Sequence, residues 1–85
     1  MKNGILRSVK GGYKKMDVLT KLDAYMALMA KIQNGITPAE GKEELLKIRQ
    51  MPLETENEEQ EGFAKNDTDA YFNQMELRIV EFFRK

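Results

Sequence analysis

The chain has 85 residues, and its 14 basic and 14 acidic side chains give a formal net charge of zero. A chain of this length forms one small domain and buries only roughly 60% of its unfolded surface. It contains no cysteine and no histidine, which excludes disulfides, most zinc-ligand sets and the usual nucleophile–base pairs of enzymes. We therefore expect a non-catalytic protein without a cofactor, and we expect self-association to supplement its small core.

A basic arm opens the sequence, because residues 1–15 contain basic side chains and no acid. We expect Gly11 and Gly12 to turn the backbone so that Tyr13 docks on the helix that follows. The arm has three interpretations: a solvated segment, a contact with an anionic membrane or acidic partner, and a contact with nucleic acid. Nucleic acid is disfavoured because no recognition helix is evident and the second half of the chain is acidic. The candidate contact residues are Arg7, Lys10, Lys14 and Lys15.

The first predicted helix starts near Lys15 or Met16 and ends at Gln33, where Asn34 and Gly35 are typical of a helix C-terminus. Its apolar residues recur at alternating intervals of four and three, which is the spacing of a heptad seam. Methionines at such positions most often fill a core, and a peptide-binding groove is the alternative. The seam residues are Val18, Leu22, Tyr25, Met29 and Ile32, and the flanking residues that widen the seam are Leu19, Met26 and Leu28.

The second predicted helix has the clearest start in the sequence. Thr37 at the N-cap, Pro38 at the first helical position and Glu40 at the third form a capping box. Pro52 stops the helix after Met51. Because the preceding loop is short, we expect this helix to fold back antiparallel onto the first one.

An acidic linker, residues 52–61, follows the hairpin, and we expect it to be a solvated and mobile connector. A third helix is predicted from about Asn66, which would serve as its N-cap, to the end of the chain. Its seam residues are Thr68, Phe72, Met75, Ile79 and Phe82.

The chain contains an internal repeat with an offset of 50 residues. Each copy begins with a Gly-aromatic turn and continues into one of the two seams, which then coincide position by position. The two long helices are therefore expected to pack on each other, either within one chain or between two chains. The best aligned pairs are Gly12 with Gly62, Tyr13 with Phe63, Lys15 with Lys65, and Asp17 with Asp67.

A Gly-Tyr turn followed by charged residues, a valine and an apolar seam resembles the N-terminal domain of DivIVA-like proteins. The resemblance implies an oligomeric scaffold that recruits cell-division or envelope proteins and acts in septum placement or polar growth of a bacterium. In that family a Phe-Arg pair before the Gly-Tyr binds lipid, whereas Lys10 and Gly11 occupy those places here. The matching residues are Gly12, Tyr13, Asp17, Val18 and Leu22, and more loosely Gly62, Phe63, Asp67, Ala70 and Tyr71.

The predicted fold is all-α and one compact unit, with a basic arm and helical hairpin in residues 1–51, the acidic linker in residues 52–61, and the second Gly-aromatic motif with the third helix in residues 62–85. We expect an intertwined oligomeric helical bundle, a homodimer first, in which the two seams form the interface. A small helical regulatory or nucleic-acid-binding protein is the alternative, and a magnesium-dependent enzyme built on glutamates is the least favoured class. No apolar run suits a secretory signal or a membrane span, so we expect a cytoplasmic protein, with peripheral membrane contact as an option.

Overall fold

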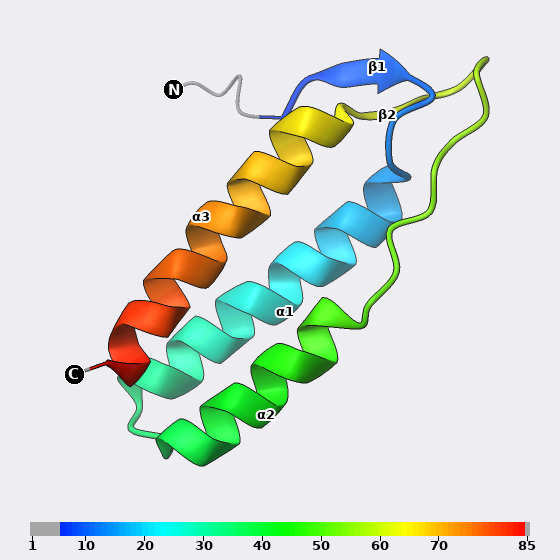
Figure 1. Cartoon of the computed structure of the whole chain (residues 1–85). Coiled ribbons are helices and arrows are strands. Elements are labelled where there is room, and N and C mark those ends of the chain that lie inside the picture. Colours follow the sequence, from blue (N-terminus) through cyan, green and yellow to red (C-terminus); the bar gives the residue numbers. More distant parts are fainter. Residues whose placement is uncertain (1–5, 85) are drawn as a thin grey trace.

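The computed structural model describes residues 6–84, and within that range it contains three helices and two short strands. The helices α1 and α3 run in the same direction, α2 runs against them, and the strands lie at the end where α1 and α3 begin (Figure 1). The mostly helical class is confirmed, whereas the strand pair is not among the predicted elements. In chain order the elements are β1 (Ser8–Lys10), α1 (Lys15–Gln33), α2 (Pro38–Arg49), β2 (Glu61–Phe63) and α3 (Lys65–Phe83).

The predicted boundaries of the helical hairpin are confirmed, with one small difference. Asn34 caps the C-terminus of α1, and Gly35 follows it with a φ of 94°, a left-handed conformation that glycine adopts without strain. At the start of α2, the Thr37 hydroxyl accepts a hydrogen bond from the backbone N–H of Glu40 at 3.2 Å. The helix ends at Arg49, before the predicted Met51, because a residue that precedes proline is disfavoured in the helical conformation.

The start of α3 differs from the prediction. Asn66 is not the N-cap, because the helix begins at Lys65 and Ala64 occupies the cap position without a side-chain hydrogen bond. The α1 helix starts in the same way, after Lys14 and with no side-chain cap. In both helices, the extended backbone after the Gly-aromatic turn leads directly into the first turn of the helix. The backbone of the Gly-aromatic turn therefore determines where each helix starts.

The core lies between the three helices and is built mainly from the two predicted seams. The rings of Tyr25 and Phe72 lie 5.3 Å apart between their centroids and join the middle of α1 to α3. Thr68, fully buried in the second seam, donates its hydroxyl to the carbonyl oxygen of Ala64 at 2.9 Å, so no polar group is left unpaired there. The buried apolar cluster comprises Val18, Tyr25, Leu28, Leu45, Ile48, Phe72, Met75 and Ile79.

The two Gly-aromatic turns pair with each other in an antiparallel bridge at the strand end of the bundle. We call this arrangement the crossing of the turns. The backbone N–H of Tyr13 donates to the Phe63 carbonyl at 2.9 Å, and the N–H of Phe63 donates to the Tyr13 carbonyl at 2.9 Å. A Cβ atom on Gly12 would collide with the Phe63 carbonyl oxygen, and one on Gly62 would collide with that of Tyr13. The glycines of the repeat therefore permit this close approach of two backbones. The antiparallel pairing of β1 with β2 extends it, with Val9 opposite Gly62.

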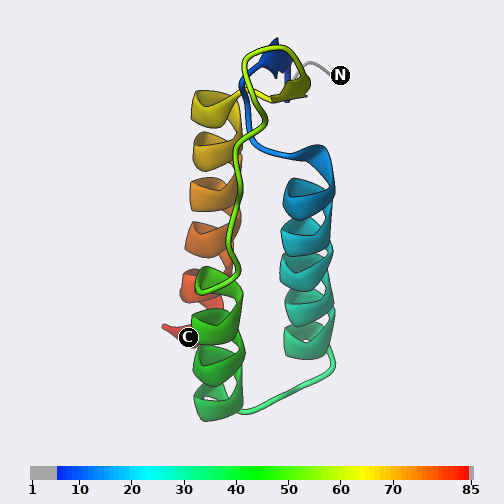
Figure 2. The same ribbon diagram turned by 90° about the vertical axis from the view of Figure 1, so that its right-hand side faces the viewer.

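The acidic linker is ordered by contacts with the first repeat, which corrects the prediction of a mobile connector. It runs along the bundle from the end of α2 to the strand pair (Figure 2). The backbone N–H of Glu54 donates to the Asp17 carboxylate at 3.0 Å, and that of Glu56 donates to the Gly12 carbonyl at 2.7 Å. Composition alone did not indicate this, because most of the hydrogen bonds that hold the linker use its backbone, with the Glu54 side chain adding an ion pair to Lys14.

We predict that Gly62→Ala lowers the free energy of unfolding by about 3 kcal/mol, because its methyl group meets a backbone carbonyl that cannot rotate away. Urea unfolding followed by far-ultraviolet circular dichroism measures this change. Gly35→Ala is the control, since it meets no atom within 4 Å and tests only the cost of a left-handed conformation, about 1 kcal/mol. Equal losses in the two variants would contradict the proposed crossing.

Candidate functional site

The seam residues predicted to join two chains lie instead within a single chain. Val18, Tyr25, Phe72, Met75 and Ile79 are buried in the chain's own core, and Leu22, Met29 and Ile32 pack against that core. Phe82 is the exception, because 39% of its surface is exposed. In the described chain α1 and α3 pack on each other, which is the within-chain arrangement of the two that the repeat allows. A charged residue in place of Phe72 would therefore unfold the chain, and surface residues must carry any contact with a partner.

The four residues of the Gly-aromatic turns, Gly12, Tyr13, Gly62 and Phe63, are brought together by the crossing. Each aromatic ring lies beneath a lysine of the opposite repeat: the Lys15 ammonium is 5.3 Å from the Phe63 centroid, and the Lys65 ammonium is 5.8 Å from that of Tyr13. These are reciprocal cation–π contacts.

Tyr13 docks on α3, the helix of the other repeat, and not on the helix that follows it. Its hydroxyl donates to the Asp69 carboxylate at 3.0 Å, and its ring takes the lysine of the same helix. Burial and this hydrogen bond raise the pKa of the Tyr13 phenol. The crossing of the turns explains why each aromatic ring contacts the helix of the other repeat, because it places the ring over the start of that helix.

The described part of the basic arm, residues 6–15, does not form a separate cationic patch. Arg7 makes an ion pair with Asp67 at 2.8 Å, and Lys14 makes one with Glu54 at 3.3 Å. The side-chain hydrogen bond from Arg7 holds the pKa of the Asp67 carboxyl below its usual range. With Lys15 placed over an aromatic ring, three of the four predicted contact residues already have partners inside the chain. Lys10 lies exposed on β1.

A polar triad links the three helices at the level of the core. The Tyr25 hydroxyl donates to Glu76 at 2.6 Å, and the Arg49 guanidinium donates to the other oxygen of the same carboxylate at 3.0 Å. Burial and the Glu76 hydrogen bond raise the pKa of Tyr25. Partial burial by itself would raise the pKa of Glu76, but the hydrogen bonds from Arg49 and Tyr25 outweigh it and lower that pKa.

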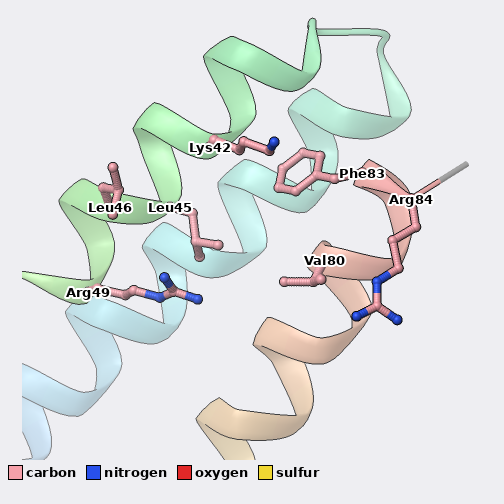
Figure 3. A pocket seen from close by; sticks show the side chains of 7 residues that line it. All are labelled: Lys42, Leu45, Leu46, Arg49, Val80, Phe83 and Arg84. Carbon is pink, nitrogen blue, oxygen red and sulfur yellow. The ribbon is translucent and has the colours of Figure 1, made fainter.

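An apolar groove with a volume of about 420 Å³ lies between α2 and α3. Figure 3 shows Leu45, Leu46, Val80 and Phe83 at this groove, which we call the α2–α3 groove. Gly41 shapes one end of it, because a Cβ atom there would lie 2.6 Å from the Phe83 ring. The side chains that carry charge along the groove are Lys42, Arg49 and Arg84.

A second apolar surface lies between α1 and α3, and we call it the α1–α3 groove. It consists of two adjoining hollows of about 180 and 280 Å³ that share Met29 and Arg78. Met26, which is 57% exposed, lines this groove, whereas Met75 belongs to the buried core and Met29 packs against it. The lining residues of the two hollows are Met26, Met29, Tyr71, Gln74, Met75, Arg78, Glu81 and Phe82.

The sequence did not predict the α2–α3 groove. Its one visible signal was Leu46, an apolar residue next to the core residue Leu45 and off the buried face of α2, where it is 54% exposed. The cationic residues of the groove come from two helices that are far apart in sequence, so no local pattern unites them. Within residues 6–84, no cluster of acidic side chains suits a metal ion, and no helix is long and apolar enough to cross a membrane.

Comparison of the chain with protein-family models, with curated proteins and with solved structures gives no match. The two grooves and the polar triad are therefore interpreted from their own geometry.

We predict that acid weakens the fold through Glu76. Because the folded state lowers its pKa below the ordinary value of 4.5, the stabilisation is complete above that pH and is lost as pH falls through the folded pKa. Glu76→Gln should cost about 1.5 kcal/mol of unfolding free energy at neutral pH and flatten the pH dependence below 4.5. Urea titrations at a series of pH values measure both effects. The control is Glu43→Gln, at an exposed position; parallel pH curves for Glu76→Gln and the parent chain would contradict this role.

Proposed function

We propose that this chain is a non-catalytic helical adaptor that binds an acidic, apolar segment of a partner protein in the α2–α3 groove. The observation that carries the proposal is the composition of that groove: its floor is apolar, and its charged lining residues Lys42, Arg49 and Arg84 are all cationic. Such a surface favours a segment that combines large apolar side chains with carboxylates.

The dimensions of the groove support an anchoring role. Its volume of about 420 Å³ suits one or two large apolar side chains of an amphipathic helix. Leu46, which is half exposed, would lose its remaining contact with water when such a helix binds. Lys42 and Arg84 are exposed at the groove, so they are placed to pair with carboxylates on either side of the anchor. Arg49 is shared with Glu76 and contributes less.

The absence of catalysis is supported by composition. The chain has no histidine or cysteine, so its one serine, Ser8 on β1, has no imidazole to activate it. The cellular setting is proposed from the resemblance to DivIVA-like proteins, which rests on the Gly-aromatic turns. On that basis the adaptor would act in bacterial cell division or in septum or pole placement, and its partners would be proteins of that machinery.

A synthetic amphipathic helix of leucine and glutamate, labelled for fluorescence anisotropy, tests the proposed groove. We expect it to bind with an affinity that falls as salt is added, and a leucine–lysine helix of the same pattern should not bind. Leu46→Glu and Lys42→Glu should each weaken binding roughly tenfold or more, the equivalent of 1.4 kcal/mol. Met16→Glu, at a position 73% exposed on α1, is the matched control and should have no effect. Equal binding of the acidic and basic helices would overturn the proposal.

A further inference from the structure

The internal repeat gives the α1–α3 pair two equivalent faces, and α2 covers only one of them. On the covered face, Lys21 of α1 donates to the carbonyl of Met51 just after α2, and Glu76 of α3 binds Arg49 of α2. By the repeat offset of 50 residues, α1 and α3 are equivalent to each other. The position equivalent to Lys21 is Tyr71, and the position equivalent to Glu76 is Met26. Both of these counterparts line the α1–α3 groove. This groove is therefore equivalent, by the internal repeat, to the surface of the α1–α3 pair against which α2 packs. No helix of the described chain fills it.

The α1–α3 groove contains exposed apolar side chains that a packed helix would bury: Met26 is 57% exposed and Phe82 39%. Leu19, on the same helix as Met26, is 44% exposed. The helical spacing of Leu19, Leu22, Met26 and Met29, with intervals of three, four and three, places them on one stripe of α1. An uncovered stripe of this kind, beside a groove, is typical of a surface that binds a protein.

The charges of the groove identify the partner. Arg78 and Glu81 lie one helical turn apart on α3 and both line it, and neither belongs to an ion pair within residues 6–84. Arg78 occupies the place that Leu28 takes in the other repeat, where Leu28 is 2% exposed. A groove with one unpaired cation and one unpaired anion is self-complementary when a second copy packs on it in the antiparallel direction.

We propose that a second copy of this chain docks on the α1–α3 groove through the same groove of its own. In this two-fold dimer, Arg78 of each copy pairs with Glu81 of the other, while the stripe of α1 and Phe82 become buried between them. The α2–α3 grooves remain on the outside, so the dimer presents two partner sites and gains affinity for partners that carry paired segments. The self-association stands on this groove alone and does not depend on the proposed partner site.

Reversal of the charges tests the dimer, with sedimentation equilibrium of the full chain across a wide concentration range as the measurement. The parent chain should dimerise, and either Arg78→Glu or Glu81→Arg should weaken dimerisation by at least about tenfold, because each variant opposes like charges across the two-fold axis. An equimolar mixture of the two variants should form a heterodimer. The double variant R78E/E81R should form a homodimer again, since it restores opposite charges at every contact.

Apolar and outward-facing variants complete the experiment, and circular dichroism checks that each one folds. Met26→Glu should abolish dimerisation, whereas Leu77→Glu, at a position 64% exposed outside the α1–α3 groove, should leave it unchanged. Leu46→Glu should also leave it unchanged, which separates this proposal from the α2–α3 site. A parent chain that is monomeric at all concentrations would overturn the proposal, and a dimer insensitive to Met26→Glu and both charge reversals would do so equally.

Discussion

The close contact between two backbones at the strand end of the bundle is the constraint on which the rest of the structure depends. The Tyr13 and Phe63 amide groups exchange hydrogen bonds, and they can do so only because Gly12 and Gly62 present no side chain to the opposing carbonyls. This contact sets the spacing and the parallel direction of α1 and α3 at their first turns. The two seams then meet from Val18 and Thr68 to Ile79, and the core follows from that meeting.

The crossing also explains why one chain contains a parallel pair of equivalent helices, which the repeat pattern by itself could equally place in two chains. A parallel pair of equivalent helices is the usual geometry of a dimer, and here both helices belong to one polypeptide joined by α2 and the ordered linker. The α2 helix breaks the two-fold symmetry of the α1–α3 pair. The pair has two equivalent faces, and a single α2 can cover only one of them. One face is covered by Leu45 and Ile48 of α2, and the other is left with an apolar stripe. The proposed partner surfaces are consequences of this asymmetry.

The distribution of charge follows the same arrangement. The basic arm and the acidic linker approach the opposite repeats at matching places: the backbone of Arg7 and its side chain bind Asp67, and the backbone of Glu54 binds Asp17. The Arg7–Asp67 and Lys14–Glu54 ion pairs join opposite charges from separate parts of the sequence, whereas the Glu54 N–H gives the Asp17 carboxylate a hydrogen bond. Lys42 and Arg84 at the α2–α3 groove, and Arg78 and Glu81 at the α1–α3 groove, belong to no ion pair within residues 6–84. Net charge alone, which is zero, carries no information about either surface.

The sequence by itself determined the elements whose causes are local. The capping box at Thr37, the glycine after Asn34 and the two apolar seams specified the helical hairpin, the third helix and most of the core, because side-chain spacing and cap chemistry act within a few residues. Only the tertiary structure decided that the seams meet within one chain, that the linker is ordered and that the aromatic residues exchange helices. Those outcomes depend on backbone hydrogen bonds between segments about 50 residues apart in the repeat, and such contacts leave no periodic pattern in either segment.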